Sequence, residues 1–248
     1  MNREEICNKQ FRKLFGGDRT EHPTDPEFMD ILQKFIFGEV SRVGKLDNKM
    51  RELITITVLS TMQTLPQLKS HVKACLNVGL TPIEIREAIY EVAPFIGFPK
   101  TLNAIDAMNE VFAASDIKLP LEKTGTTTDE NRYEEGLKIQ EPIYGTEIKD
   151  KYSNLPENIG ENLAKFLSAN CFGDYYTRKG LDIKTRELLV ICILATLQMT
   201  EPLVSHVYGN IKVGNSIETI YAALIQCLPY IGFPLTFSAI NSIKDLNI

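Results

Sequence analysis

Hydrophobic side chains recur three and four residues apart along most of this chain, which is the spacing of helices with one buried face. A first long helix is expected to begin after Asp47, whose carboxylate is a suitable N-cap, and to be interrupted near Pro66. A second helix is expected to end at Gly79, where a left-handed C-cap fits. Thr81 opens a third, because its capping hydroxyl is followed by a proline and by Glu84 at the third helical position. Signals for β-strands are weak, so the pattern predicts an all-α fold.

The helical pattern occurs twice. When residues 46–105 are compared with residues 181–240, a shift of 135 positions without a gap, 26 of the 60 positions are identical. Identity of this extent over one structural unit indicates a tandem duplication. An earlier match pairs Phe15-Gly16 with Tyr144-Gly145 at a shift of 129, which indicates that about six residues were inserted into the second copy.

The duplication predicts two domains. We expect a first repeat over residues 1–120 and a second, more degenerate repeat over residues 130–248, each with a core of its own. The segment from Ser115 to Glu130 contains Pro120, Gly125 and three consecutive threonines, a composition typical of a linker.

Composition narrows the classes of partner. The net charge is −5 and the charged residues are dispersed, so no basic stripe indicates nucleic-acid binding. The N-terminus is charged, and the apolar runs are broken by Thr, Gln or Pro before they reach membrane-spanning length, so we expect no membrane segment and a cytoplasmic location. The five cysteines include no Cys-x-x-Cys pair and none recurs at the shift of 135. They are therefore expected to be free thiols, without a disulfide framework or a metal site.

Two of the three histidines occupy equivalent positions in the repeats. His71 follows Glu52 by 19 residues, and His206 follows Glu187 by the same distance. Each glutamate lies in an otherwise apolar helix, where an unpaired charge is costly. A buried Glu–His pair can relay a proton, with the carboxylate orienting the ring. Alternatively, each glutamate pairs with a cation such as the preceding arginine, and each histidine binds a backbone carbonyl in the core.

The spacing sets a geometric condition on this pair. In a tight antiparallel hairpin bent at Pro66, Glu52 and His71 would be about 12 Å out of step along the helix axis. Direct contact then requires that the helices cross obliquely. Otherwise the link would be a bound water or a partner from the other repeat or another subunit.

Several elements of the first repeat together resemble the carboxymuconolactone decarboxylase family, whose fold is shared with alkyl hydroperoxidase D. They are Arg51-Glu52-Leu53, Ser70-His71-Val72, Gly79-Leu80-Thr81-Pro82-Ile83-Glu84-Ile85 and Gly97-Phe98-Pro99 with Asn103-Ala104. The resemblance covers about 60 residues of the first repeat and, in a more degenerate form, the same stretch of the second. It implies that the chain is a tandem duplication of an alkyl hydroperoxidase D-like helical unit.

The chain departs from the peroxidase-like members of this family. Those members carry a Cys-x-x-Cys between the glutamate and the histidine, whereas Thr64 and Gln67 stand at these places here, and Met199 and Pro202 in the second copy. Without a thiolate at these places there is no nucleophile to attack a peroxide. Cys75 is a possible substitute, but no second cysteine is near it in the sequence. A peroxiredoxin-type hydroperoxide reductase is therefore an alternative function.

The remaining branch of the resemblance implies a cofactor-free, metal-independent decarboxylase of a small carboxylated lactone, similar to 4-carboxymuconolactone, in aromatic catabolism. We expect His71 to deliver a proton to carbon and Glu52 to orient it, with the same roles for His206 and Glu187. The candidate substrate-binding residues are Arg51 and Arg186 as cations for the carboxylates, Phe98 and Phe233 as pocket walls, and Thr64 and Gln67 at the places of the absent cysteines.

Other interpretations remain open. The chain could be a non-catalytic oligomeric scaffold, or it could use the same Glu–His pair for base chemistry on an unrelated substrate. Members of the family assemble as rings of small helical units, so the resemblance also implies a homo-oligomer in which three fused chains build a six-unit ring.

The third helix differs between the repeats. Its first copy carries three glutamates that the second lacks: Glu84, Glu87 and Glu91 are replaced by Thr219, Ala222 and Gln226. If one of these carboxylates serves the site, only the first repeat is active. Their spacing places them on one helix face, which we interpret as a solvated face.

Overall fold

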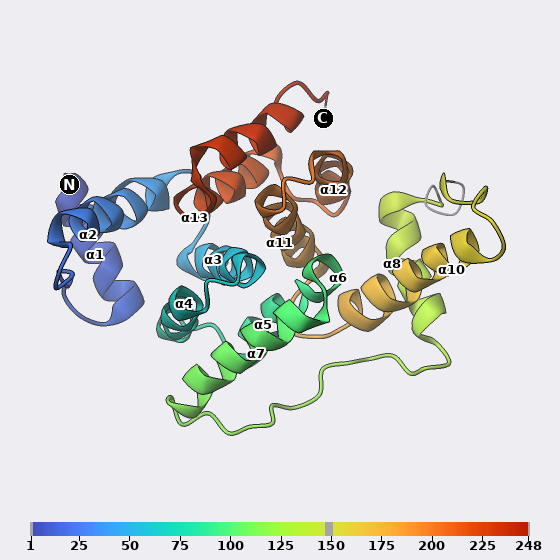
Figure 1. Ribbon diagram of the computed structural model, residues 1–248, viewed down its shortest axis with the longest axis horizontal. Coiled ribbons are helices and arrows are strands. Elements are labelled where there is room, and N and C mark those ends of the chain that lie inside the picture. Colours follow the sequence, from blue (N-terminus) through green and yellow to red (C-terminus); the bar gives the residue numbers. More distant parts are fainter. Residues whose placement is uncertain (1, 147–150, 248) are drawn as a thin grey trace.

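The computed structural model describes residues 2–146 and 151–247, and every regular element in them is helical, as predicted. The first repeat comprises α1 (Arg3–Phe15), α2 (Pro26–Gln33), η1 (Lys34–Glu39), η2 (Val40–Arg42), α3 (Asn48–Met62), α4 (Leu65–Asn77), α5 (Pro82–Tyr90), α6 (Ala93–Ile96) and α7 (Phe98–Ala113). The second comprises α8 (Arg132–Tyr144), α10 (Ile159–Phe166), η3 (Leu167–Tyr176), α11 (Ile183–Thr196), α12 (Thr200–Lys212) and α13 (Ile217–Ile243). A long stretch without helix joins α7 to α8 along one edge of the molecule (Figure 1).

The two repeats share one large hydrophobic core. Helices α3 and α11 lie against each other at the centre of the molecule, and α13 packs on both (Figure 1). A single cluster of buried side chains draws on both of these central helices and on the helices around them. The expectation of a separate core for each repeat was therefore wrong. The reason is that every residue from Arg51 to Thr61 on α3 and from Arg186 to Ala195 on α11 is buried, so each repeat covers a face that the other would leave in water.

Contacts between the repeats are reciprocal. Arg51 on α3 donates a 2.8 Å hydrogen bond to Gln226 on α13, and Arg186 on α11 bonds Glu91 at 2.5 Å, directly after α5. The two contacts are equivalent at the repeat shift of 135, since Arg186 corresponds to Arg51 and Gln226 corresponds to Glu91. Residue i meets j, and the equivalent of j meets the equivalent of i, which is the pattern of a two-fold interface. The chain thus folds as two related units joined face to face.

The ends of the helices follow local signals in the sequence. Asp47 caps α3 by accepting a bond from the backbone N–H of Met50 at 2.8 Å. Thr81 and Glu84 form a reciprocal capping box at the start of α5. Gly79 has a φ of 84°, the left-handed conformation expected after the second helix. These boundaries are confirmed, and they fix where α3 and α4 begin and end around the candidate site.

Helix α13 is 27 residues long and apolar, and by length and composition alone it could cross a membrane. Its backbone breaks at Gly232, which has a φ of 80°. Gly97 adopts nearly the same conformation, φ 82°, at the start of α7 in the first repeat. The long helix is therefore two helices separated by a kink, and its buried side forms part of the shared core with α3 and α11.

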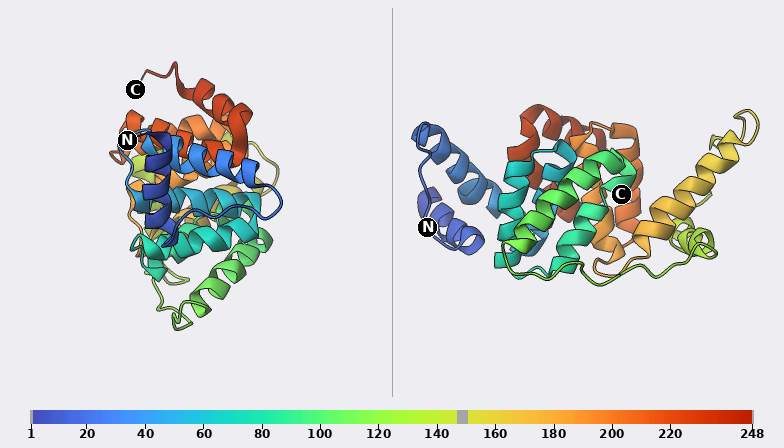
Figure 2. Two further views of the ribbon diagram at one scale, coloured as in Figure 1. Left: turned by 90° about the vertical axis from the view of Figure 1, so that its left-hand side faces the viewer. Right: turned by 60° about the horizontal axis from the view of Figure 1, so that its bottom comes forward.

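Two helical arms extend from opposite ends of the central body (Figure 2). One consists of α1, α2 and η1, and the other of α8, α10 and η3. Helix α1 ends at Phe15 and α8 at Tyr144, each followed by a glycine of positive φ, so the equivalence inferred from the shift of 129 holds in the structure. Both arms bring these aromatic residues back toward the body, where the histidines lie.

Candidate functional site

Glu52 and His71 are in direct contact. Helix α3 carries Glu52, α4 carries His71, and an oxygen of the carboxylate lies 2.7 Å from Nδ1 of the ring. The contact is therefore direct and lies within one repeat. The carboxylate is buried and the histidine side chain is 9% exposed. The preceding Arg51 does not pair with Glu52, since its guanidinium bonds Gln226 and the carbonyls of the 40–46 segment.

Aromatic side chains from two different parts of the chain surround this first pair. The ring of Phe15, at the end of α1, packs edge-on against His71 with 5.7 Å between centroids. The ring of Tyr230, from α13 of the other repeat, packs edge-on at 5.8 Å. The Tyr230 hydroxyl lies 3.4 Å from that of Thr55 on α3. Burial and the charge of Glu52 raise the pKa of Tyr230, so the hydroxyl keeps its proton.

The second pair has the same Glu–His contact, and further side chains bind to it. His206 Nδ1 lies 3.0 Å from Glu187, and the histidine side chain is 17% exposed. The hydroxyl of Tyr144 donates to the same carboxylate oxygen at 2.5 Å and lies 2.7 Å from His206 Nδ1. Tyr176 donates to the other oxygen at 2.8 Å. Phe95, from the first repeat, packs edge-on against His206 at 6.1 Å.

The two sites exchange the positions of tyrosine and phenylalanine. Phe15 of the first repeat corresponds to Tyr144 of the second, and Phe95 corresponds to Tyr230. Each histidine thus meets one aromatic residue from its own repeat and one from the other. The hydroxyl group comes from the other repeat at the first site and from the same repeat at the second.

The cysteines lie outside this arrangement. All five are free and buried. Burial, together with the nearby charge of Glu52, raises the pKa of Cys75 well above its ordinary value, so this group is a thiol and not a thiolate. Across residues 2–146 and 151–247, no group of three or more His, Cys, Asp or Glu side chains is placed to hold a metal ion.

The glutamates of the third helix do not form a solvated face, and that interpretation was wrong for Glu87 and Glu91. Both are fully buried. Glu87 bonds Arg86, Arg178 and Arg186, and the two last belong to the other repeat. The period of the helix identifies one face correctly, but two of the three arginines that bind Glu87 come from the other repeat.

The predicted cations have partners away from the histidines. Arg186 is fully buried between Glu91 and Glu87, and Arg51 is bound by Gln226 and by backbone carbonyls. Binding of a substrate carboxylate by Arg51 or Arg186 stays a prediction, and both guanidinium groups would have to exchange existing bonds for it.

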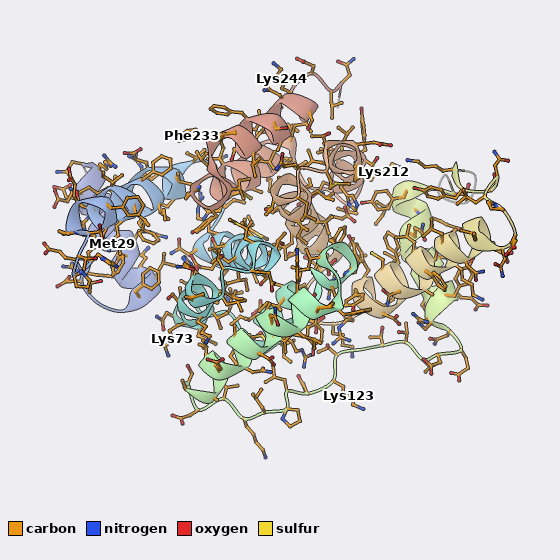
Figure 3. All side chains as sticks on the ribbon, viewed as in Figure 1. Met29, Lys73, Lys123, Lys212, Phe233 and Lys244 are labelled. Carbon is orange, nitrogen blue, oxygen red and sulfur yellow. The ribbon has the colours of Figure 1, made fainter. Side chains whose placement is uncertain are left out.

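The other candidate contacts lie nearer the surface. Phe98 and Phe233 are 61% and 52% exposed, and Phe233 lies on the outer side of α13 (Figure 3). Phe98 helps line a cavity of about 250 Å³ between α7 and η3, beside Tyr90 and Arg178. Thr64 directly precedes α4, and Gln67 is exposed one turn before His71. Their roles in substrate binding stay predictions.

Sequence reasoning missed the aromatic residues of both sites. Tyr144 was used only as a marker of the repeat, and Phe95, Tyr176 and Tyr230 were not considered. The exchange of tyrosine for phenylalanine between equivalent positions was visible in the aligned repeats. The aligned repeats did not show that the fold places each of these residues against a histidine.

Comparison with known proteins agrees with this architecture. The chain is 36% identical over 87 residues to 4-carboxymuconolactone decarboxylase of Acinetobacter baylyi, a match that covers 35% of this chain and 64% of that protein. It is 26% identical over 95 residues to nitrosuccinic acid decarboxylase of Metarhizium robertsii, covering 37% and 66% respectively. The chain therefore spans less than two thirds of the length of either relative.

The fold as a whole also has a solved counterpart. A structure from Burkholderia xenovorans, named for a gamma-carboxymuconolactone decarboxylase subunit, aligns with a TM-score of 0.58 over 98% of this chain and 95% of that chain, at 19% sequence identity. The sequence profile of the carboxymuconolactone decarboxylase family matches twice, at residues 26–110 and 161–245. Because these two matches together cover more than half of the chain, the protein belongs to the carboxymuconolactone decarboxylase family.

Proposed function

We propose that the protein is a cofactor-free decarboxylase of a small carboxylated lactone similar to 4-carboxymuconolactone, and that Glu52 and His71 carry the reaction. The main support is the 2.7 Å contact between the buried carboxylate and Nδ1 of a ring that still reaches the surface. Two relatives of the chain are named decarboxylases.

The chemistry needs one proton and a poorly solvated carboxylate. The bond between the carboxylate carbon and the lactone ring breaks, CO2 leaves, and the electron pair moves into the lactone carbonyl as an enolate. A proton then bonds to carbon and restores neutrality. Because Glu52 binds Nδ1 of His71, Nε2 is the nitrogen that delivers this proton. The rings of Phe15 and Tyr230 exclude water beside the pair.

Release of CO2 from 4-carboxymuconolactone tests the proposal. His71→Asn should lower kcat by about 10²–10⁴-fold, the usual contribution of a positioned acid, and Glu52→Gln should lower it through loss of ring orientation. His22→Asn is the matched control, because His22 is exposed between α1 and α2 and should be dispensable. Undiminished turnover by His71→Asn would remove this residue from the mechanism. A wild-type protein that assembles but releases no CO2 would favour the scaffold interpretation.

We also propose that the chain assembles with copies of itself, as a trimer that builds a six-unit ring. Exposed apolar residues lie at equivalent positions of the two arms: Phe28 and Ile31 on α2, and Leu163 and Phe166 on α10. Apolar stripes at both ends of a molecule suit head-to-tail contacts that close into a ring. Light scattering should give three times the 28.0 kDa chain mass. Phe166→Asp should reduce it, and a monomeric wild-type protein would contradict the ring.

A further inference from the structure

The two Glu–His pairs differ in how many hydrogen-bond donors the carboxylate serves. Glu52 accepts from His71. Glu187 accepts from His206 and from two tyrosines, one on each oxygen. The difference centres on Tyr144, because its hydroxyl binds the oxygen that His206 also uses and lies 2.7 Å from the ring nitrogen itself. Tyr176 occupies the opposite oxygen and leaves the Glu–His contact alone.

The Tyr144 hydroxyl is a fixed donor at this place. Burial, and then the negative charge of Glu187, raise the pKa of Tyr144 far above its ordinary value of 10.0. The proton therefore stays on the phenol and is committed to the carboxylate. Glu187 is fully buried, so its bonds to these donors are not exchanged for water.

A glycine makes room for the Tyr144 hydroxyl. A Cβ atom at Gly209 on α12 would lie 2.5 Å from that oxygen and 2.9 Å from the ring carbon that bears it, closer than atoms can approach. The equivalent position on α4 is Ala74, which belongs to the buried cluster against which Phe15, the counterpart of Tyr144, packs. Two separate substitutions thus agree: tyrosine goes with glycine at the second site, and phenylalanine with alanine at the first.

We infer that Tyr144, admitted by Gly209, locks the second Glu–His pair and takes it out of proton transfer, so that the first repeat is the working site. The locked pair keeps the geometry of the first, but its carboxylate accepts the tyrosine proton and its Nδ1–H has the phenol oxygen as a second acceptor. The assignment of chemistry to the first repeat rests on the proposed decarboxylation, whereas the lock itself does not.

The lock can be measured without a substrate from the lifetime of the imidazole Nδ1–H proton. The chain contains three histidines, so ¹⁵N-histidine labelling gives few signals, and His22→Asn identifies one of them. In the wild-type protein the His206 proton should exchange with water about tenfold more slowly than the His71 proton, the effect of one additional hydrogen bond. Exposure alone predicts the opposite order, because the His206 side chain is the more exposed of the two.

Reciprocal substitutions should remove the tyrosine hydrogen bond from the second site and introduce one at the first. Tyr144→Phe, which adds no atom and leaves Gly209 in place, should shorten the His206 lifetime to that of His71. Phe15→Tyr with Ala74→Gly should lengthen the His71 lifetime about tenfold, and Ala74→Gly alone is its control. Equal lifetimes in the wild-type protein, or a His206 lifetime unchanged by Tyr144→Phe, would overturn the lock.

The assignment of catalysis to the first repeat is tested by CO2 release from 4-carboxymuconolactone in the same variants. Release should fall at least about tenfold in Phe15→Tyr/Ala74→Gly, and it should persist in Ala74→Gly and in Tyr144→Phe. Release that survives His71→Asn and disappears in His206→Asn would overturn the assignment to the first repeat. A wild-type protein without any release would contradict the proposed function alone, because the proton lifetimes would still report the lock.

Discussion

Replacing Glu87 by glutamine removes one negative charge from a buried cluster that joins the repeats. Its carboxylate lies 3.2 Å from Arg86, 2.8 Å from Arg178 and 3.2 Å from Arg186, and it accepts a 2.7 Å bond from Thr124. Glutamine keeps the shape but leaves these guanidinium groups without their shared counter-charge. Loss of one partner of a buried ion pair destabilises a protein by about 3–5 kcal/mol.

The lower end of this range applies to Glu87→Gln. Arg186 keeps its 2.5 Å bond to Glu91, and Arg178 is partly exposed, so water can compensate for part of the loss. We therefore expect a decrease of about 3 kcal/mol in the free energy of unfolding. For a chain of this length, that corresponds to a fall in Tm of roughly 6–12 °C.

Glu91→Gln is the matched control, because the molecule already contains an arginine–glutamine contact at the equivalent place in the other repeat. At the equivalent position Gln226 accepts a 2.8 Å bond from Arg51. Burial raises the pKa of Glu91 against the opposing charge of Arg186. This variant should destabilise the protein less than Glu87→Gln does, because Arg186 keeps its 3.2 Å contact with Glu87. Urea unfolding followed by circular dichroism measures both. A Glu87→Gln variant within about 1 kcal/mol of the wild type, or equal losses in the two variants, would contradict a counter-charge role for Glu87.

Three further predictions follow from single features. Arg178 and Thr124 hold the pKa of Glu87 below its ordinary value of 4.5 against the opposing effect of burial, so its stabilisation is present above that pH and is lost as the pH falls below it; urea unfolding from neutral to acid pH should show a smaller acid loss in Glu87→Gln. Thr81→Ala should destabilise the protein by about 1 kcal/mol through loss of the α5 cap, measured by the same method. Because all five cysteines are buried, a thiol reagent should react with the native protein far more slowly than with the protein in urea, and rapid labelling of Cys75 would contradict this.

Helix boundaries could be predicted from the sequence because the signals that set them are local. Asp47, Thr81 and Gly79 act on atoms within a few residues, so their effect is visible without knowing the rest of the fold. Whether Glu87 and Glu91 are buried depends instead on arginines of the other repeat. A helical period identifies which residues share a face, but it carries no information about what covers that face.

The candidate site shows the same division. The repeated spacing from Glu52 to His71 was enough to suggest a pair, because two copies of one unusual buried glutamate point to a common partner. The aromatic residues at each histidine could not be assigned, since Tyr230 reaches His71 from the other repeat. The lock by Tyr144 depends on a distance of a few ångströms to Gly209, which only coordinates provide.

The reciprocal contacts between the repeats bear on how such a molecule can evolve. In a dimer of identical subunits every substitution at the interface is made twice, so a residue that suits one contact must also suit its symmetry mate. Joining the halves in one polypeptide removes that constraint. Glutamate could be retained opposite Arg186 while glutamine came to stand opposite Arg51, and each half of the interface could diverge on its own. A single polypeptide then behaves as a heterodimer whose two halves are covalently linked.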